Sequence, residues 1–288
     1  MRAVFRHEIK SCFSSIMTYV FGAFLLVFAG LYTVIYNLKN MLVNFEYVLS
    51  NMSLAFLIIV PVLTMRILAE ERKQKTDQLL YSLPISMTQV ILGKFFALLT
   101  VMAVPVGIIS LYPLILSAYG NVYLPAVYGS VVGFFLLGAA LIAIGIFISS
   151  LTESQPVAAG LCFVVMLLNY YLSTVAAYAD TSALSSLGVL TLLVVLMAVI
   201  VRRMTKNTFT AIIAGMVVEA AILIGYIVNA SAFEGLIPKI MEKLSVFDRF
   251  YVFVYGVFDV TGLVYLLTVI GIFLFLSVQS MEKRRWSE

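Results

Sequence analysis

The side chains that most often carry out chemistry are scarce in this chain and do not fall into catalytic patterns. A single histidine, His7, excludes a two-histidine zinc motif of the HExxH type. No GxSxG and no phosphate-binding GxxxxGK[ST] occurs, and the Gly93–Lys94 pair lacks the glycine that such a loop needs five positions earlier. Cys12 and Cys162 have no metal-ligand spacing and cannot form a disulfide framework. We therefore predict no catalytic residue and no metal site, and we expect no ATP hydrolysis by this chain itself.

One acidic residue stands out because its neighbours in sequence are apolar. Glu219 lies near the middle of the segment GMVVEAAILIGY. A carboxylate inside a membrane span is costly and is a functional candidate by default. Glu219 could bind a cation, relay a proton or contact a polar group of a substrate. The structural alternative is a protonated carboxyl group, or one that bonds to a tyrosine or serine of a neighbouring helix.

The most densely charged internal stretch is PVLTMRILAEERKQKTDQLLYSLPIS, residues 61–86. It separates two long apolar segments, so we place it in the cytoplasm, where it could contact a soluble partner. Arg66 and Glu70 are four residues apart at the end of the first of these segments, a spacing that allows an ion pair across one helical turn. We interpret this pair as structural.

Composition assigns the chain to the integral membrane proteins. Hydrophobic residues make up 63% of the 288 residues and charged residues only 11%, with a mean hydropathy of +1.10. Soluble domains carry roughly 25% charged residues. The apolar runs are continuous and do not alternate, which favours helices over the strands of a barrel.

The fold class that we predict is an all-α polytopic membrane protein with about eight transmembrane helices. A spanning helix needs about 20 mainly apolar residues. The predicted spans lie near residues 16–36, 52–70, 95–117, 126–149, 156–178, 184–201, 209–229 and 260–279.

The orientation follows from the distribution of Lys and Arg. With both termini in the cytoplasm, 14 of the 18 basic residues lie on the cytoplasmic side, and only Lys39, Lys239, Lys243 and Arg249 lie outside. Cytoplasmic loops retain basic residues, so this asymmetry supports cytoplasmic termini and an even number of spans. The basic character therefore gives no argument for a nucleic-acid partner.

The first fifteen residues are amphipathic. Arg2, Arg6 and Lys10 recur every fourth residue, and an apolar stripe of Phe5, Ile9 and Phe13 runs beside them. We predict a helix over 1–15 that lies in the membrane interface. Ordinary flanking positive charge is the alternative, and both interpretations give the same topology.

Several of these segments together resemble the type-2 ABC-transporter permeases, specifically their gliding-motility-like branch. PVLTMRILAEE (61–71) resembles the P-x-x-T-M-R-x-x-A-E-E signature, and TDQLLYSLPIS (76–86) resembles T-x-E-L-L-x-x-x-P-[VI]-S. Leu92–Phe95 is similar to L-G-K-[FY], AIGIFISSLTESQ (143–155) to A-I-G-x-F-x-S-S-L-T-x-x-Q, and Tyr255–Asp259 to the element before the last span. The resemblance covers roughly residues 1–178 and 245–286.

The resemblance implies a permease subunit of an ATP-binding-cassette exporter in a bacterial cell membrane. Its expected partners are a cytoplasmic ABC ATPase dimer, a second permease subunit in a homo- or heterodimer, membrane lipid and an extracytoplasmic accessory protein. ATP and Mg would be bound by the ATPase, and this chain would hold no cofactor.

The resemblance also implies that the loop at 71–86 carries the coupling helix that sits in a groove of the ATPase. Thr76 is suited to an N-cap, Leu79, Leu80 and Leu83 give an apolar face, and Pro84 is compatible with a stop nearby. A second, smaller contact would lie at 149–155. The ATPase-coupling residues that we predict are Thr76, Asp77, Gln78, Leu79, Leu80, Leu83 and Glu153.

The chain departs from the family pattern in four places. Lys75 replaces the usual glycine, Gln78 replaces the usual glutamate, and Pro156 stands where an aliphatic residue is common. The larger departure is an apparent extra helix pair at 184–229, which contains Glu219. We predict one transmembrane domain over 1–288, with extracytoplasmic or re-entrant helices at 233–258, for which a surface amphipathic helix is the alternative.

Two other classes of function compete with the permease. A secondary transporter would use Glu219 as its ion or proton site, but it would need broken helices and internal repeats, and no convincing repeat is present. A membrane enzyme or scaffold is disfavoured by the missing catalytic patterns. Co-purification of an ATPase with the chain would separate the permease from both.

Overall fold

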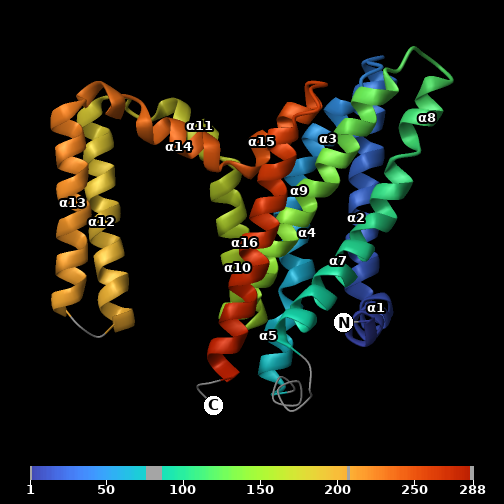
Figure 1. Cartoon of the computed structure of the whole chain (residues 1–288). Helices are drawn as coiled ribbons and strands as arrows, with labels where there is room; N and C mark the ends of the chain where they lie inside the picture. The colour runs from blue at the N-terminus through green and yellow to red at the C-terminus, as the bar shows by residue number, and fades with distance from the viewer. Residues whose placement is uncertain (1, 76–85, 206–207, 286–288) are drawn as a thin grey trace. The chain divides into compact units, whose positions relative to one another are not determined.

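The chain folds into helices alone over the residues that the structure describes, 2–75, 86–205 and 208–285 (Figure 1). This computed structural model confirms the predicted all-α membrane fold. The helices fall into two compact units, Met1–Leu168 with Val246–Glu288, and Asn169–Ser245.

The first unit contains most of the helices and is entered through an N-terminal helix. Ser15 adopts an extended backbone (φ −88°, ψ 133°), which separates this helix from the next, and the Thr18 hydroxyl donates to the Cys12 carbonyl across the turn at 2.6 Å. In chain order the elements are α1 (Arg2–Ser14), α2 (Ile16–Tyr32), η1 (Thr33–Lys39), α3 (Glu46–Met52), η2 (Ser53–Ala55), α4 (Phe56–Thr64), α5 (Arg66–Lys73), α7 (Met87–Ile109), α8 (Tyr112–Ser117), α9 (Leu124–Leu151), α10 (Gln155–Tyr170), α15 (Val246–Val254) and α16 (Val260–Arg285).

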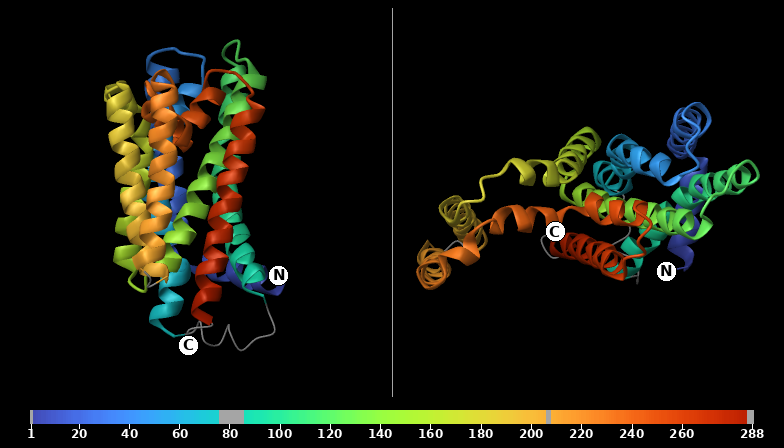
Figure 2. Two further views of the ribbon diagram at one scale, coloured as in Figure 1. Left: turned by 60° about the vertical axis from the view of Figure 1, so that its left-hand side comes forward. Right: turned by 90° about the horizontal axis from the view of Figure 1, so that it is seen from above.

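Helix α9 is the centre of the first unit. The helices α4, α5, α7, α15 and α16 all pack against it, and α16 runs along much of its length (Figure 1 and Figure 2). Small residues allow this approach, because a Cβ at Gly138 would collide with Met102 and one at Gly145 with Thr64. Stacked rings of Phe56 and Phe134, with centroids 4.5 Å apart, fill the space near Gly138. Much of the core of the first unit is therefore built by contacts to α9, while α7 packs in addition against α1, α2 and α16.

Helix α15 is part of this core. Its side chains Val246, Phe247, Phe250 and Phe253 are almost fully buried, and Phe253 packs on Gly133 of α9. The residues 246–254 thus form a buried helix, unlike the surface amphipathic helix that was the alternative for this part of 233–258.

The second unit consists of a long helical hairpin and shorter helices. Its elements are α11 (Leu172–Tyr178), α12 (Ala183–Thr205), α13 (Thr208–Val228), η3 (Ala230–Phe233) and α14 (Leu236–Leu244). Helices α12 and α13 lie side by side, and α14 packs on α11 (Figure 1). Many large apolar side chains of the hairpin are exposed, among them Leu192, Leu193, Ile224 and Ile227. Such a surface suits lipid and not water.

Five helical segments of the described residues are long and apolar enough to cross a membrane: Ile16–Lys39, Glu46–Lys73, Met87–Ser117, Leu124–Leu151 and Val260–Arg284. The number rises to seven if two broken pairs, Gln155–Tyr170 with Leu172–Tyr178 and Gly215–Val228 with Ala230–Leu244, each count as one span. The second pair bends by 116°. The predicted span 184–201 corresponds to the shorter apolar stretch Ala183–Val199. The predicted eight are thus reached only when both broken pairs and this stretch are counted.

The first prediction concerns the close contact between α9 and α4. A methyl group at Gly145 would lie 2.8 Å from both Cβ and Cγ2 of Thr64, which is fully buried. We expect Gly145→Ala to lower the free energy of unfolding by about 1–3 kcal/mol, as overpacking does, despite the higher helix propensity of alanine. Gly160→Ala on α10 is the control, because nothing lies within 4 Å of its Cβ. Thermal unfolding in detergent measures both, and equal midpoints for the two variants would contradict the packing argument.

Candidate functional site

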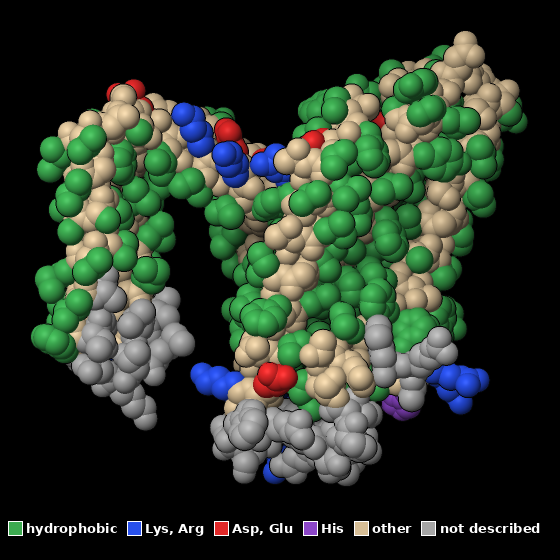
Figure 3. Space-filling view, viewed as in Figure 1, with side chains coloured by type: hydrophobic (Ala, Val, Ile, Leu, Met, Phe, Trp, Pro, Cys, Tyr) green, Lys and Arg blue, Asp and Glu red, His purple; other side chains and the backbone are tan. Residues whose placement is uncertain are grey.

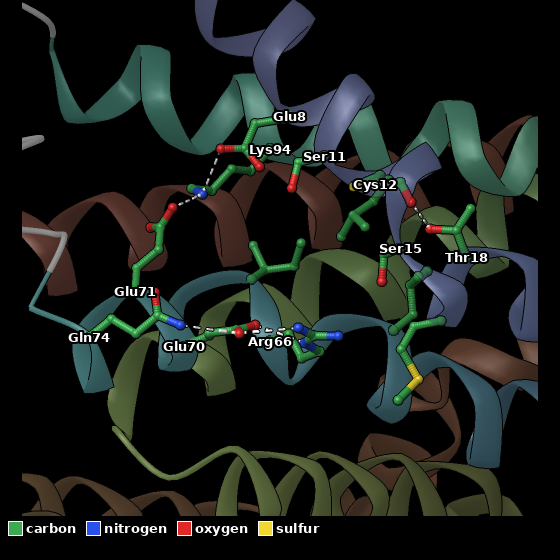
Figure 4. Close-up of a pocket in the computed structure, with 14 residues that line it drawn as sticks. Glu8, Ser11, Cys12, Ser15, Thr18, Arg66, Glu70, Glu71, Gln74 and Lys94 are labelled. Atoms are coloured by element: carbon green, nitrogen blue, oxygen red, sulfur yellow. Dashed lines mark hydrogen bonds and ion pairs between the residues drawn. The ribbon is translucent and has the colours of Figure 1, made fainter.

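A polar pocket of about 300 Å³ lies at one end of the first unit, among α1, α2, α5 and α7 (Figure 4). Charged side chains from three of these helices converge here: Glu8 from α1, Glu70 and Glu71 among others from α5, and Lys94 from the otherwise mostly apolar α7. The polar lining residues are Glu8, Ser11, Cys12, Ser15, Thr18, Arg66, Glu70, Glu71, Gln74 and Lys94. Five charged side chains, those of Glu8, Arg66, Glu70, Glu71 and Lys94, therefore line one cavity.

The ammonium group of Lys94 is the centre of this arrangement. Lys94 Nζ lies 2.6 Å from Glu71 Oε1 of α5 and 2.9 Å from Glu8 Oε1 of α1 (Figure 4). The lysine side chain is only 2% exposed, whereas those of Glu8 and Glu71 are 14% and 24% exposed. A buried charge is tolerated when it is paired and hydrogen-bonded. Lys94 therefore connects three helices at one point.

The residue before Lys94 explains how α1 comes so close to α7. A Cβ at Gly93 would lie 2.9 Å from Cγ1 of Val4 and 3.4 Å from the backbone nitrogen of Phe5. Any larger side chain would push α1 away and lengthen the distance between Glu8 and Lys94. The sequence Gly93–Lys94 thus provides both the space and the charge for the contact.

Arg66 and Glu70 form an ion pair along α5. Arg66 Nε donates to Glu70 Oε2 at 2.7 Å, and Arg66 Nη2 donates to Glu70 Oε1 at 3.1 Å. Both side chains are partly exposed, at 39% and 28%, so the pair is worth no more than about 1 kcal/mol. It supports the local helix, which agrees with a structural role.

Burial changes the acidity of Cys12, which lines the same pocket. Desolvation raises the pKa of the Cys12 thiol, the nearby charge of Glu8 raises this pKa further, and Lys94 opposes both. The thiolate is the reactive form of cysteine, so Cys12 reacts slowly at neutral pH.

The predicted second contact, near Glu153, is held by the end of α16. Arg284 Nη1 lies 3.4 Å from Glu153 Oε1, and Arg284 Nη2 donates to the Leu151 carbonyl at 3.5 Å. The Ser280 hydroxyl donates to the Ser150 carbonyl at 3.3 Å. Glu153 is 69% exposed, so it remains available to a partner.

The predicted coupling residues Thr76, Asp77, Gln78, Leu79, Leu80 and Leu83 lie outside the described residues. The structure describes the two flanks of this segment. Lys75 has a left-handed backbone (φ 56°) after α5. On the other side Ser86 caps α7, because its hydroxyl accepts the Gln89 N–H at 3.3 Å.

Glu219 lies on α13 in the second unit. The half-buried positions of this helix recur at 215, 218, 219, 222, 225 and 226, the spacing of one helical face. This face meets α12, since a Cβ at Gly215 would lie 3.3 Å from that of Ala198. Within the part of the chain that the structure describes, Glu219 has no hydrogen-bond or ion-pair partner.

The sequence-based search missed the role of Lys94, Glu8 and Glu71. It placed Lys94 among the cytoplasmic basic residues before a span that begins at 95, whereas α7 begins at Met87 and Lys94 is buried within it. The available signal was a lysine between apolar residues in LGKFFALL. Among the described residues, no three His, Cys, Asp or Glu side chains gather in a way that could hold a metal ion.

Comparison with known proteins identifies the family. Residues 2–171 match the family model described as ABC-2 family transporter protein, which is more than half of the chain. No curated protein matches the chain. The matched region includes α1, α5, α7 and α9, and therefore the Lys94 contacts and the segment 76–85.

The second prediction tests the buried ion pairs. We expect Lys94→Met to lower the free energy of unfolding by about 3 kcal/mol, because two partly buried carboxylates lose their common cation. Lys10→Met, an exposed lysine of α1, is the control and should change stability little. Denaturant unfolding followed by circular dichroism measures both variants. A Lys94→Met protein as stable as Lys10→Met would show that the buried contacts contribute nothing.

Proposed function

The chain belongs to the ABC-2 family of transporter proteins, and from this premise we propose that it is the permease subunit of an ATP-binding-cassette exporter. As a member of that family, it is a multi-pass membrane component of a transporter and not the catalytic part. A separate cytoplasmic ATPase dimer would bind ATP and Mg and drive transport. A second permease subunit, identical or different, would complete the membrane pore, and an extracytoplasmic accessory protein could join it.

The observation that carries this proposal is the extent of the family match, from 2 to 171. It includes the helices of the first unit through α10 and both loops that are predicted to contact the ATPase. The motifs at 61–71 and 143–155 support the narrower placement in the gliding-motility-like branch. The apolar surface of both units suits the surrounding lipid (Figure 3).

In the proposed mechanism, movement of the ATPase reaches the spans through short cytoplasmic elements. The segment 76–83 would dock on the ATPase through Leu79, Leu80 and Leu83, and Glu153 would contribute to a second contact. Helix α5 leads directly into the first segment, and Lys94 ties α5 to α1 and α7. A displacement of the docked segment would thus act on three helices at once.

We propose a bacterial cell-membrane location with both termini in the cytoplasm and the two units as parts of one transmembrane domain. The chain ends of the first unit, α5 and the turn at 149–155 lie at the same end of that unit (Figure 1). The 14 basic residues assigned to the cytoplasm favour this end as the inner one. Glu219 would shape the additional hairpin, outside the coupling machinery.

The third prediction concerns this orientation. Single cysteines at 73 and 121 are introduced into a variant in which Cys12 and Cys162 are replaced by alanine. A membrane-impermeant maleimide added to intact cells should label position 121 and spare position 73, and permeabilised cells should show both. Labelling of position 73 in intact cells would overturn the orientation.

The fourth prediction tests the docking segment and, with it, the proposed function. Truncating a packed interface anchor costs roughly 2 kcal/mol or more, so the double change Leu79→Ala and Leu80→Ala should weaken ATPase association at least about 30-fold. The matched control is Leu192→Ala with Leu193→Ala, an adjacent pair that is 61% and 52% exposed on α12. Co-purification of the ATPase from detergent extracts measures the association. Equal recovery with both variants would exclude 76–83 as the main contact, and no ATPase with the unsubstituted chain would contradict the permease assignment.

A further inference from the structure

The helix that leads into the proposed docking segment continues the span before it, with a one-residue interruption of the regular helical hydrogen bonding at Met65. Helix α4 ends at Thr64 and α5 begins at Arg66, with Met65 between them. Pro61 lies one turn earlier and lacks a backbone N–H, which weakens the hydrogen bonding of a helix at this place. The Met65 N–H still bonds to the Pro61 carbonyl at 2.9 Å. The interruption is therefore local: Met65 keeps a helical backbone (φ −56°, ψ −31°), and the nearby amides of Leu68 and Ala69 find their partner outside the helix.

A serine of another helix provides these partners. Ser149 of α9 is fully buried, and its hydroxyl oxygen accepts the N–H groups of Leu68 and Ala69, each at 3.2 Å. The same hydroxyl lies 3.3 Å from the Met65 carbonyl, to which it donates. A hydroxyl has one donor and two acceptor positions, so all the bonding capacity of Ser149 is spent on the break between α4 and α5.

This arrangement differs from an ordinary helix cap. The N-cap side chain of a helix normally precedes it in sequence, whereas Met65 makes no side-chain cap and the capping hydroxyl comes from a residue 84 positions farther along the chain. Gly145 lies one turn before Ser149 on the same face of α9 and contacts Thr64. The missing side chain at 145 lets α9 approach closely enough for Ser149 to reach the backbone of α5.

The opposite end of α5 is held by the ion pair between Glu71 and Lys94, at 2.6 Å. An ion pair depends weakly on angle, whereas hydrogen bonds to backbone groups are directional. The two ends of α5 are thus held by bonds of different character. The end near Met65 is held by directional bonds to Ser149, whereas the end near Glu71 is held by the ion pair and by the contact of Arg72 with Met281 of α16, at 3.6 Å.

We propose that Ser149 is a positioning residue that acts as the pin of a hinge at Met65, about which α5 turns when the ATPase moves. This role rests on the proposed function. The hydroxyl keeps the first amides of α5 bonded to α9 while the far end of the helix shifts. Ser149 thereby converts a movement of the docking segment into a movement of α9, the central helix of the first unit.

The first experiment measures the pin without any ATPase. Hydrogen–deuterium exchange of the purified chain is followed at the amides of Leu68 and Ala69 in Ser149→Ala and in Ser150→Ala. Ser150 is the matched control, because it is also fully buried but its hydroxyl donates within its own helix, to the Phe147 carbonyl at 2.6 Å. We expect exchange roughly five- to tenfold faster in Ser149→Ala only, the effect of losing a helix cap. Ser149→Thr, which keeps the hydroxyl, should restore slow exchange.

Two results of this experiment would overturn the proposal. Unchanged exchange in Ser149→Ala would show that the hydroxyl does not hold the start of α5. Equal acceleration in Ser149→Ala and Ser150→Ala would indicate general loosening of the end of α9. Either result is independent of what the chain transports or binds.

The second experiment measures the hinge in the complex with the co-purified ATPase. Spin labels at 73 and 154, both exposed positions at the ends of α5 and after α9, report their separation without nucleotide and with Mg–ATP and vanadate. The distance should shift between the two states in the unsubstituted complex and in Ser150→Ala. In Ser149→Ala the ATPase should remain bound, the distance distribution should broaden and the shift should be lost.

The outcomes separate the hinge from the function on which it rests. A full shift in Ser149→Ala would overturn the role of Ser149 in coupling while the permease assignment stands. No shift in the unsubstituted complex, or no ATPase bound to it, would contradict the proposed function and with it the coupling role. The exchange result would still decide whether Ser149 pins the start of α5.

Discussion

The buried ammonium group of Lys94 is the constraint on which one end of the first unit depends. Lys94 lies inside an apolar helix and is shielded from water, so its charge must be balanced by protein groups. Glu8 and Glu71 meet this need from two other helices. The position of α1 beside α7, the small residue at 93 and the direction of α5 all follow from bringing two carboxylates to one ammonium group. Disturbing any of these features would lengthen the contact between Lys94 and at least one of its two carboxylates.

The close packing around α9 limits where the first unit can move. Met102 and Thr64 occupy the space that side chains at 138 and 145 would take, so α9, α7 and α4 fit against one another without spare volume. Close-packed interiors transmit displacements and absorb few of them. A change at the end of α5 that leads to residue 76 is therefore taken up at Met65, where the regular helical hydrogen bonding is already interrupted. The close packing around α9 thus keeps the spans rigid, and the interruption at Met65 gives α5 a place to turn.

Hydropathy predicted the helical spans well because lipid leaves the backbone no other way to satisfy its hydrogen bonds. The helices Ala183–Thr205 and Thr208–Val228 carry the same hydropathy signal, and the contact of Arg66 with Glu70 follows from their spacing of four residues on a helix. The Lys94 contacts were not predictable, because Glu8, Glu71 and Lys94 are brought together only by tertiary packing. Likewise, Ser149 looks like any small residue of an apolar helix until the break at Met65 is seen beside it.

The two anchors of α5 suggest why an ion pair and a hydroxyl are used in different places. The point about which α5 turns must be held by interactions that weaken when the geometry changes. The three hydrogen bonds of the Ser149 hydroxyl to the backbone have this directional property. A moving end requires an attraction that persists over a range of positions, and a charge shared between two carboxylates has that property. If the ion pair lay near Met65 and the hydroxyl contacts near Glu71, α5 would be loosely held where it joins the span and firmly held at its other end. In the structure the directional bonds lie where α5 joins the span, and the ionic contacts lie toward residue 76. This order suits a helix that turns about Met65 when its other end, near Lys73, is displaced.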